Sequence, residues 1–322
     1  MRWIALLCSW IFLVIGLVAP AAADDLRLAV ALGPVSLPIY VAQANGYFRA
    51  EGVGLVITDC ASGRSCFQEQ LLGRADMATA TELMVVMDSF TSPEAVILAS
   101  ISSSTRHIKL IARRSAGVNS PEGLRGKKIG TVAGTSAEYF LDSWLLFHDI
   151  DPADVRVVSM APQQLADALR RRDIDAVAIW EPEASAAIAA LGNDLTVLPN
   201  AKVYDQHFCL TAKHGLSYAR QGEIIKILRA LDRAERFIAE QPSAAATIGI
   251  ARLADSKNMG SLDEHVFKLS LNQSLVSTMD GQARWARRRG LVPASGPSPN
   301  MLSHIEPALL RLVQNTAVTL AH

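Results

Sequence analysis

The chain reads LRGKKIG at 124–130, GTS at 134–136, DIDA at 173–176 and WEP at 180–182. The first segment is typical of a loop that enters a buried strand, and the second places small hydroxyl residues where a helix begins. The third leads into another apolar strand, which ends at an aromatic–acid–proline corner. Polar groups thus gather at strand ends, where open α/β sheets bind their ligands. The stretch predicts an α/β unit with a ligand site at one edge of its sheet.

Further segments upstream continue this pattern. They read PIYVA at 38–42, GYF at 46–48, EGV at 51–53 and GRADMA at 73–78. In this order, and together with the stretch quoted above, they resemble the periplasmic solute-binding proteins of the sulfonate/nitrate/taurine type. That family also includes binders of pyrimidine precursors. The resemblance extends over roughly residues 26–212.

The resemblance implies a fold. It implies an α/β, two-lobe periplasmic binding protein of type II, with parallel-rich sheets, two hinge crossovers and a helical carboxy-terminal part. Strands separated by helices favour the parallel sheets independently. Apolar residues also recur at helical spacing from residue 224 onward. We expect lobe 1 to comprise residues 24–108 and 212–322, and lobe 2 to comprise residues 109–211.

The amino terminus has the pattern of an export signal. Arg2 precedes an apolar run from Trp3 to Val18, and small residues at Ala21 and Ala23 suit signal peptidase. We therefore predict a signal peptide over residues 1–23 and a periplasmic location. The alternative is a retained membrane anchor, because the run is almost long enough to span a bilayer.

Charge and motif content narrow the function. Lysine plus arginine equals aspartate plus glutamate at 31 each, which gives no reason to expect nucleic acid or an anionic membrane as a partner. The sequence contains no Gly-x-Ser-x-Gly, His-Glu-x-x-His or Gly-x-Gly-x-x-Gly. We expect no cofactor, no metal and no catalytic residue.

Cysteines suggest one covalent link. Cys60, Cys66 and Cys209 follow the predicted cleavage site, and the first two are close enough in sequence to pair in an oxidising compartment. A disulfide closing so short a loop would contribute roughly 2–3 kcal/mol. We predict a Cys60–Cys66 disulfide, with two free, partly buried thiols as the alternative.

Ligand-binding candidates in the first lobe lie in loops at strand ends and at helix amino termini, where unpaired N–H groups point outward. They are Ser36, Tyr40, Ser62, Thr79, Thr81 and Glu82. Ser36 and Tyr40 offer a hydroxyl and an aromatic face, although a plain turn would also explain them. Thr81 and Glu82 could instead cap a helix and complement its dipole. Arg64 is interpreted as a solvated side chain.

Candidates in the second lobe and at the return crossing are Gly134, Thr135, Ser136, Trp180, Glu181 and Asp205. The resemblance places the Gly-Thr-Ser step at the ligand, although ordinary helix capping is an alternative. Trp180 could stack on a flat ligand and Glu181 could accept from an amine. The alternative is a tryptophan packed in the hinge core beside an exposed Glu181. Asp205 is the weakest candidate of the set.

Charges in these loops favour one kind of ligand. Glu82, Glu181 and Asp205 are balanced only by Arg64 and Arg106. We therefore expect a ligand with a cationic or hydrogen-donating end, such as an amino-sulfonate or an aminopyrimidine. The Arg287–Arg289 run is interpreted as a solvated helix end.

Function follows from the resemblance. It implies an extracytoplasmic solute-binding protein of an ABC importer that traps a sulfonate, a nitrate-like anion or an aminopyrimidine between its lobes by hinge closure. The expected partners are the small solute and an ABC permease at the inner membrane, and we expect a monomer. The alternatives are an enzyme of the pyrimidine-synthase type, which would need histidines and an iron or cofactor site, and a ligand-sensing module.

Overall fold

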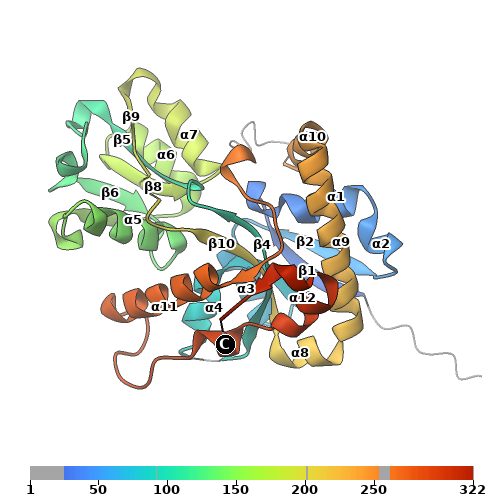
Figure 1. Ribbon diagram of the computed structural model, residues 1–322. Helices are drawn as coiled ribbons and strands as arrows, with labels where there is room; N and C mark the ends of the chain where they lie inside the picture. The colour runs from blue at the N-terminus through green and yellow to red at the C-terminus, as the bar shows by residue number, and fades with distance from the viewer. Residues whose placement is uncertain (1–24, 92, 201, 254–261, 322) are drawn as a thin grey trace, which may run out of the picture.

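The chain forms two α/β lobes and a helical carboxy-terminal part (Figure 1). The computed structural model describes residues 25–91, 93–200, 202–253 and 262–321, so the predicted signal peptide lies outside the described residues. Among these residues, no helix is both long enough and apolar enough to cross a membrane.

A five-stranded sheet with the order β2-β1-β3-β10-β4 forms the centre of the first lobe. β1 pairs in parallel with β2 and β3, whereas β10 runs antiparallel to both β3 and β4. The strands are β1 (Leu26–Ala31), β2 (Leu55–Cys60), β3 (Met77–Thr81), β4 (Ala95–Ser104) and β10 (Gln206–Lys213).

Helices of this lobe follow β1, β2 and β3 along the chain. They are η1 (Pro34–Ser36), α1 (Leu37–Ala44), α2 (Tyr47–Ala50), α3 (Gly63–Leu71) and α4 (Glu82–Asp88). Ser62 caps α3 by accepting from the N–H of Ser65 at 3.2 Å. Gly63 lets α3 approach β3, because a Cβ at this position would lie 3.1 Å from the Cα of Ala80. The start of α3 is therefore held close to the end of β3.

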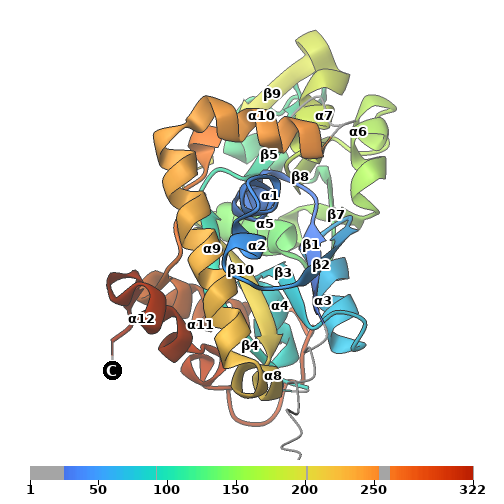
Figure 2. The ribbon, with the colours of Figure 1, turned by 90° about the vertical axis from the view of Figure 1, so that its right-hand side faces the viewer.

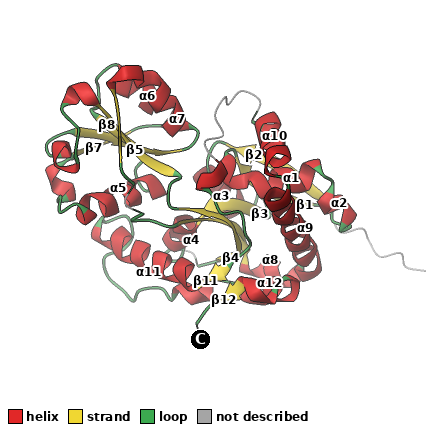
Figure 3. Ribbon diagram, turned by 45° about the horizontal axis from the view of Figure 1, so that its top comes forward, coloured by secondary structure: helices red, strands yellow, loops and turns green. Residues whose placement is uncertain are grey.

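A second five-stranded sheet, with the order β7-β6-β8-β5-β9, forms the other lobe. β6 is parallel to β7 and β8, and β5 is antiparallel to β8 and β9. The strands are β5 (Ile108–Arg113), β6 (Lys128–Thr131), β7 (Arg156–Ser159), β8 (Ala176–Trp180) and β9 (Leu195–Leu198). The helices are α5 (Ser136–Phe147), α6 (Pro162–Arg170) and α7 (Glu183–Leu191). Figure 3 shows α5 and the α6–α7 pair on opposite sides of this sheet.

The carboxy-terminal part is mostly helical and covers the first lobe. It contains α8 (His214–Ala219), α9 (Gln221–Glu240), α10 (Pro242–Arg252), β11 (Leu271–Asn272), α11 (Gln273–Arg288), α12 (Pro307–Val313) and β12 (Val318–Thr319). The long helix α9 packs against α1 and α2 (Figure 2), and α11 packs against α4. Short 3-10 turns are η2 (Arg114–Ala116), η3 (Pro121–Leu124), η4 (Pro152–Asp154), η5 (Gly192–Asp194), η6 (Leu262–Glu264), η7 (Met301–His304) and η8 (Asn315–Ala317).

Two segments carry the chain between the lobes. The first joins β4 to β5 through residues 105–107, and the second joins β9 to β10 through residues 199–205. The division expected after residue 211 falls inside β10, whose pairing places residues 206–213 in the first sheet. Separate apolar cores support the two lobes, one in the first lobe and one on each face of the second sheet.

Candidate functional site

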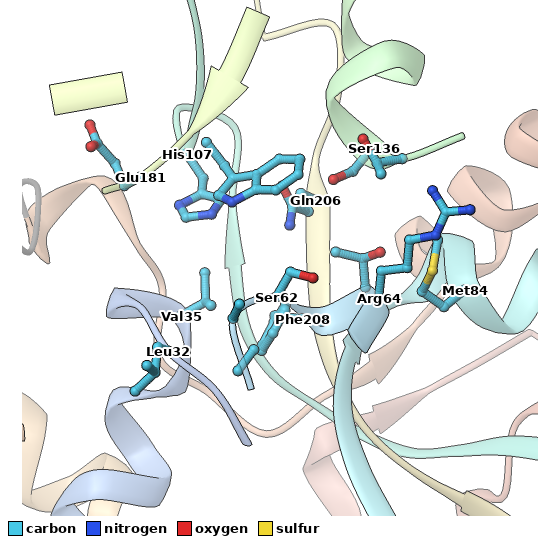
Figure 4. A pocket seen from close by; sticks show the side chains of 16 residues that line it. Leu32, Val35, Ser62, Arg64, Met84, His107, Ser136, Glu181, Gln206 and Phe208 are labelled. Carbon is cyan, nitrogen blue, oxygen red and sulfur yellow. The ribbon is translucent and has the colours of Figure 1, made fainter. Parts of the chain in front are cut away.

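A pocket that opens to solvent lies between the two lobes, and the space among its lining atoms, open solvent included, is about 490 Å³. Its walls come from the turns after β1 and β2, the start of α4, the first crossing, the start of α5 and facing ends of β8 and β10. In the view of Figure 4, Arg64 and Ser136 lie on one side of the pocket, and His107 and Glu181 lie on the other.

The amino terminus of α5 faces this pocket. Thr135 caps the helix, since its hydroxyl accepts from the N–H of Ala137 at 3.3 Å and donates to the carbonyl of Val132 at 2.6 Å. The Ser136 side chain lines the pocket, and its hydroxyl makes no hydrogen bond within the described part of the chain. A free hydroxyl beside a helix amino terminus is a favourable arrangement for an anion.

Arg64 reaches the pocket from the opposite lobe. Its Nη1 donates to the carbonyl oxygen of Ala133 at 2.9 Å, which joins α3 of the first lobe to the loop after β6 of the second. The guanidinium forms no ion pair with any residue that the structure describes. Its positive charge is therefore available to a ligand: Arg64 is solvent-exposed, as expected, and it also lines the pocket.

Glu181 is buried at the edge of the pocket and shares a lysine with a second carboxylate. The residue is 2% exposed, and its Oε2 accepts from the N–H of Ser185 at 3.0 Å. Its Oε1 lies 3.4 Å from the Nζ of Lys109, which also pairs with Glu264 at 2.5 Å. The Glu181 carboxylate thus shares the charge of Lys109 with Glu264, and Figure 4 shows it turned away from Arg64.

Apolar side chains form much of the remaining wall. They are Leu32, Val35, Met84, Trp180 and Phe208. Trp180 is partly buried and also packs against the cores on both faces of the second sheet. The pocket therefore combines a polar end near Arg64 with a wall that suits an apolar ligand body.

Two buried polar side chains complete the lining. The Nδ1 of His107 lies 3.1 Å from the Nε2 of His265, and burial keeps the pKa of His107 well below its usual range. This imidazole is therefore neutral near pH 7. Gln206 is 4% exposed, and its Oε1 has no hydrogen-bond partner within the described residues. Both lie at crossings between the lobes.

The structure places half of the predicted binding residues along this pocket. Those that line it are Ser62, Thr81, Thr135, Ser136, Trp180 and Glu181, whereas Ser36, Tyr40, Thr79, Glu82, Gly134 and Asp205 do not. Contact with a ligand stays a prediction for the first group. The second group has structural partners that explain its placement.

Three of the outlying residues hold the turn after β1. The Ser36 and Tyr40 hydroxyls donate to the carbonyl of Ala31 at 2.7 and 3.1 Å, and the Thr79 Oγ1 accepts from the Ala31 N–H at 2.9 Å. Burial raises the pKa of Tyr40 to about 12. These side chains fix the loop whose next residues line the pocket.

Glu82 belongs to a buried network at the second crossing. Its Oε1 accepts from the hydroxyl of Tyr204 at 2.5 Å and from the Nε2 of Gln282 at 2.6 Å, and its Oε2 accepts from the His207 N–H at 3.1 Å. Burial raises the pKa of Glu82 to about 7. Asp205 lies nearby and accepts from the hydroxyl of Ser274 at 3.2 Å.

Gly134 directs its N–H away from the pocket. This N–H donates to the Oε2 of Glu138 at 2.7 Å, and the residue has a φ of +68°. Such a left-handed conformation favours glycine over residues with a side chain. Gly134 thus shapes the start of α5.

The expected disulfide is corrected: Cys60, Cys66 and Cys209 are free thiols. The thiols of Cys60 and Cys66 are hydrogen-bonded neighbours, and burial raises the pKa of Cys66 strongly. A buried thiol held in its protonated form is a poor nucleophile for thiol–disulfide exchange. Among the described residues, no group of histidine, cysteine and acidic side chains is arranged to hold a metal ion.

His107 and Gln206 are polar pocket residues that sequence reasoning missed, and Arg64 was counted among the loop charges but not predicted to bind the ligand. A sequence signal exists for Arg64, because an arginine in the first turn of a helix is unfavourable for the helix dipole. His107 and Gln206 carry a weaker signal, since each is a polar residue at the edge of an apolar strand. The apolar wall has no local signal, because its members come from separate elements.

Two α/β lobes joined by two crossings, with a pocket lined from both, define a periplasmic binding protein fold. Residues 33–245 match the family model described as NMT1/THI5 like, and the chain belongs to this family. A candidate aliphatic sulfonates-binding protein of Bacillus subtilis is 22% identical over 258 residues, which are 77% of this chain and 77% of that protein.

Solved structures share the fold. The periplasmic aliphatic sulphonate binding protein SsuA from Escherichia coli superposes with a TM-score of 0.77 at 15% identity, over 88% of this chain and 92% of that chain. The desulfurization enzyme DSZB superposes with a TM-score of 0.64 at 15% identity, over 91% of this chain and 99% of that chain. The fold is therefore shared by binding proteins and by an enzyme.

Proposed function

We propose that this protein is the extracytoplasmic solute-binding protein of an ABC importer and that it traps a small organic sulfonate between its lobes. It is exported by a cleaved signal peptide, acts as a monomer in the periplasm and delivers its solute to a permease at the inner membrane. Membership of the NMT1/THI5 like family and the similarity to sulfonate-binding proteins support this proposal.

The charge of the pocket is the observation that carries the choice of an anion. Arg64 contributes a positive charge that no carboxylate of the described residues pairs with, and the amino terminus of α5 adds a partial positive charge from the other lobe. Glu181 is turned away from Arg64 and shares the ammonium of Lys109 with Glu264. Glu82 and Asp205 lie outside the pocket. These two acids therefore no longer favour a ligand with a cationic end.

The apolar wall distinguishes between anions. Nitrate is small and has no carbon body to bury against Trp180, Phe208 and Met84. A sulfonate presents three acceptor oxygens at one end and an apolar group at the other, which matches the polar and apolar ends of the pocket. An aminopyrimidine would leave the Arg64 guanidinium without an anionic partner. A sulfonate with an apolar body is therefore the favoured ligand.

Closure is the proposed mechanism. A sulfonate held by Arg64 of the first lobe and by Ser136 of the second makes its full set of contacts only when the lobes are together. Binding shifts the population toward the closed form by the free energy of these additional contacts. The carbonyl of Ala133, which accepts from Arg64, already joins the lobes on this side of the pocket.

Calorimetric titration of the purified protein with 1-butanesulfonate, taurine, nitrate and an aminopyrimidine tests the proposal. We expect 1-butanesulfonate to bind most tightly, accompanied by a decrease in the radius of gyration in solution scattering. Preference for the aminopyrimidine, or sulfonate binding without any change in scattering, would contradict the proposed ligand or the proposed closure respectively.

The competing function is an enzyme on the same fold, and the similarity to DSZB motivates it. Two observations argue against an enzyme. Among the described residues no cysteine lines the pocket, and the pocket histidine, His107, is hydrogen-bonded to His265. We propose a non-catalytic role. Mass spectrometry after incubation with aryl sulfinates and alkanesulfonates should show unchanged compounds, and release of sulfite would establish an enzyme instead.

A further inference from the structure

We infer that Arg289, on the carboxy-terminal end of α11 and outside the pocket, is a positioning residue for the bound anion. Through Glu138 it holds the amino terminus of α5 toward the pocket and compensates a carboxylate that would otherwise repel the ligand. This inference rests on the proposed function, because it concerns the same anion site.

The first link joins Glu138 to the pocket loop. Glu138 lies in the first turn of α5 and is 7% exposed. Its Oε2 accepts from the N–H of Gly134 at 2.7 Å, and its Oε1 accepts from the Nη2 of Arg289 at 3.1 Å. One carboxylate thus connects the left-handed Gly134, two residues before Ser136, to a cation on another part of the chain.

The second link fixes Arg289 itself. Its Nε lies 2.8 Å from the Oδ2 of Asp142, and its Nη2 donates to the Oδ1 of the same carboxylate at 3.2 Å. The Nε1 of Trp285 also donates to the Oδ2 of Asp142 at 2.7 Å. Asp142 and Trp285 are each 2% exposed. A fork-shaped guanidinium held by two carboxylates one helical turn apart is well defined in position.

These contacts span the two lobes. α5 belongs to the second lobe, whereas α11 packs against α4 of the first lobe. Tyr139 packs edge-on against both Tyr204 and Trp285, with ring centroids 5.0 and 5.4 Å apart. Figures 1 and 3 both show α11 alongside α5. The orientation of the α5 amino terminus relative to the first lobe is therefore set partly by α11.

The positive charge of Arg289 affects anion binding in a second way. The amino terminus of α5 attracts anions, but Glu138 places a carboxylate in that same turn. A neighbouring anion in a partly buried site would be repelled by this carboxylate unless a cation compensated it. Arg289 is the cation in contact with Glu138 in the described structure. Its removal should weaken anion binding even though it does not line the pocket.

The interpretation of the arginine run as a solvated helix end is corrected for two of its members. The Arg289 side chain is 32% exposed and bonded to α5. Arg287 donates to the hydroxyl of Ser298 at 3.0 Å. Arg288 makes no hydrogen bond or ion pair with the described residues and acts on Asp142 only through its charge, so it offers a control of the same charge at the same helix end.

Titration calorimetry with 1-butanesulfonate tests the inference on Arg289→Gln, Glu138→Gln, the double variant and the control Arg288→Gln. We expect Arg289→Gln to raise Kd about 10-fold and Arg288→Gln to change it less than about 2-fold. The double variant should recover to within about 3-fold of the wild type, because the unpaired carboxylate is also gone. Equal affinities of the two single arginine variants, or a double variant as weak as Arg289→Gln, would overturn the inference.

A ligand-free measurement separates this inference from the proposed function. Thermal unfolding first establishes that each variant is folded. Amide hydrogen exchange at Gly134 should then be faster in Arg289→Gln than in Arg288→Gln, because the acceptor of this N–H is less firmly held. If the wild type binds no sulfonate but this difference is found, the proposed ligand fails and the positioning of the loop stands. Equal exchange at Gly134 would overturn the positioning.

Discussion

Replacing Arg64 by glutamine removes the pocket's positive side chain while retaining a polar group. A hydrogen bond to a charged group contributes roughly 1.5–3 kcal/mol, which corresponds to roughly a 10- to 150-fold change in Kd. Arg64 is solvent-exposed, so screening places the expected effect toward the lower end. We therefore predict that Arg64→Gln raises the Kd for 1-butanesulfonate about 10- to 30-fold.

Two comparisons make this prediction specific. Arg74→Gln removes the same charge outside the pocket, where Arg74 pairs with Glu69 at 2.6 Å, and it should leave Kd within about 2-fold of the wild type. Calorimetry at low and high salt separates two contributions of Arg64 to binding, its hydrogen bond to the Ala133 carbonyl and its positive charge. Loss of its bond to Ala133 would weaken binding equally at all salt concentrations, whereas loss of the charge reduces the salt dependence itself. Equal Kd values for Arg64→Gln and Arg74→Gln would refute the reasoning.

Three further predictions concern other parts of the molecule. Trp180→Ala should raise Kd about 10-fold for 1-butanesulfonate but less than 3-fold for methanesulfonate, since only the longer chain buries apolar area against the ring; equal losses in calorimetry would refute this. Burial raises the pKa of Glu82 to about 7. Below pH 7 the folded state therefore holds a proton on Glu82 more tightly than the unfolded state does. The stability that this proton contributes is lost as pH rises through 7. Chemical denaturation should therefore show the wild type losing about 3 kcal/mol relative to Glu82→Gln between pH 5 and 8, and a pH-independent difference would contradict the assignment. Cys60 and Cys66 should both be alkylated in the unreduced, unfolded protein, and a mass two hydrogens lower with no alkylation would show a disulfide after all.

The fold was largely predictable because its signals are local. Strands and helices alternate in the sequence, and the glycine and hydroxyl residues at strand ends lie where the helices begin. The lobe boundary expected after residue 211 falls inside β10 for a local reason as well. Gln206 and His207 look like loop residues, yet they open the buried strand β10, and their surroundings come from both lobes.

The site was predictable only in part, because burial and pairing depend on residues far apart in sequence. Glu82 looks like a ligand-binding acid, but it is buried against Tyr204 and Gln282, which are 122 and 200 residues away. Glu181 looks anionic until Lys109 is placed beside it. Thr135 and Ser136 were recoverable, since a helix amino terminus after a strand is a local feature with a known use.

The central claim is that an organic anion is held between Arg64 of one lobe and the α5 amino terminus of the other. A crystal structure of the wild-type protein with 1-butanesulfonate tests it most directly. The account predicts sulfonate oxygens within hydrogen-bonding distance of Arg64 and Ser136, with the butyl chain against Trp180. A sulfonate bound elsewhere, or bound in this pocket with its oxygens toward Glu181, would contradict it.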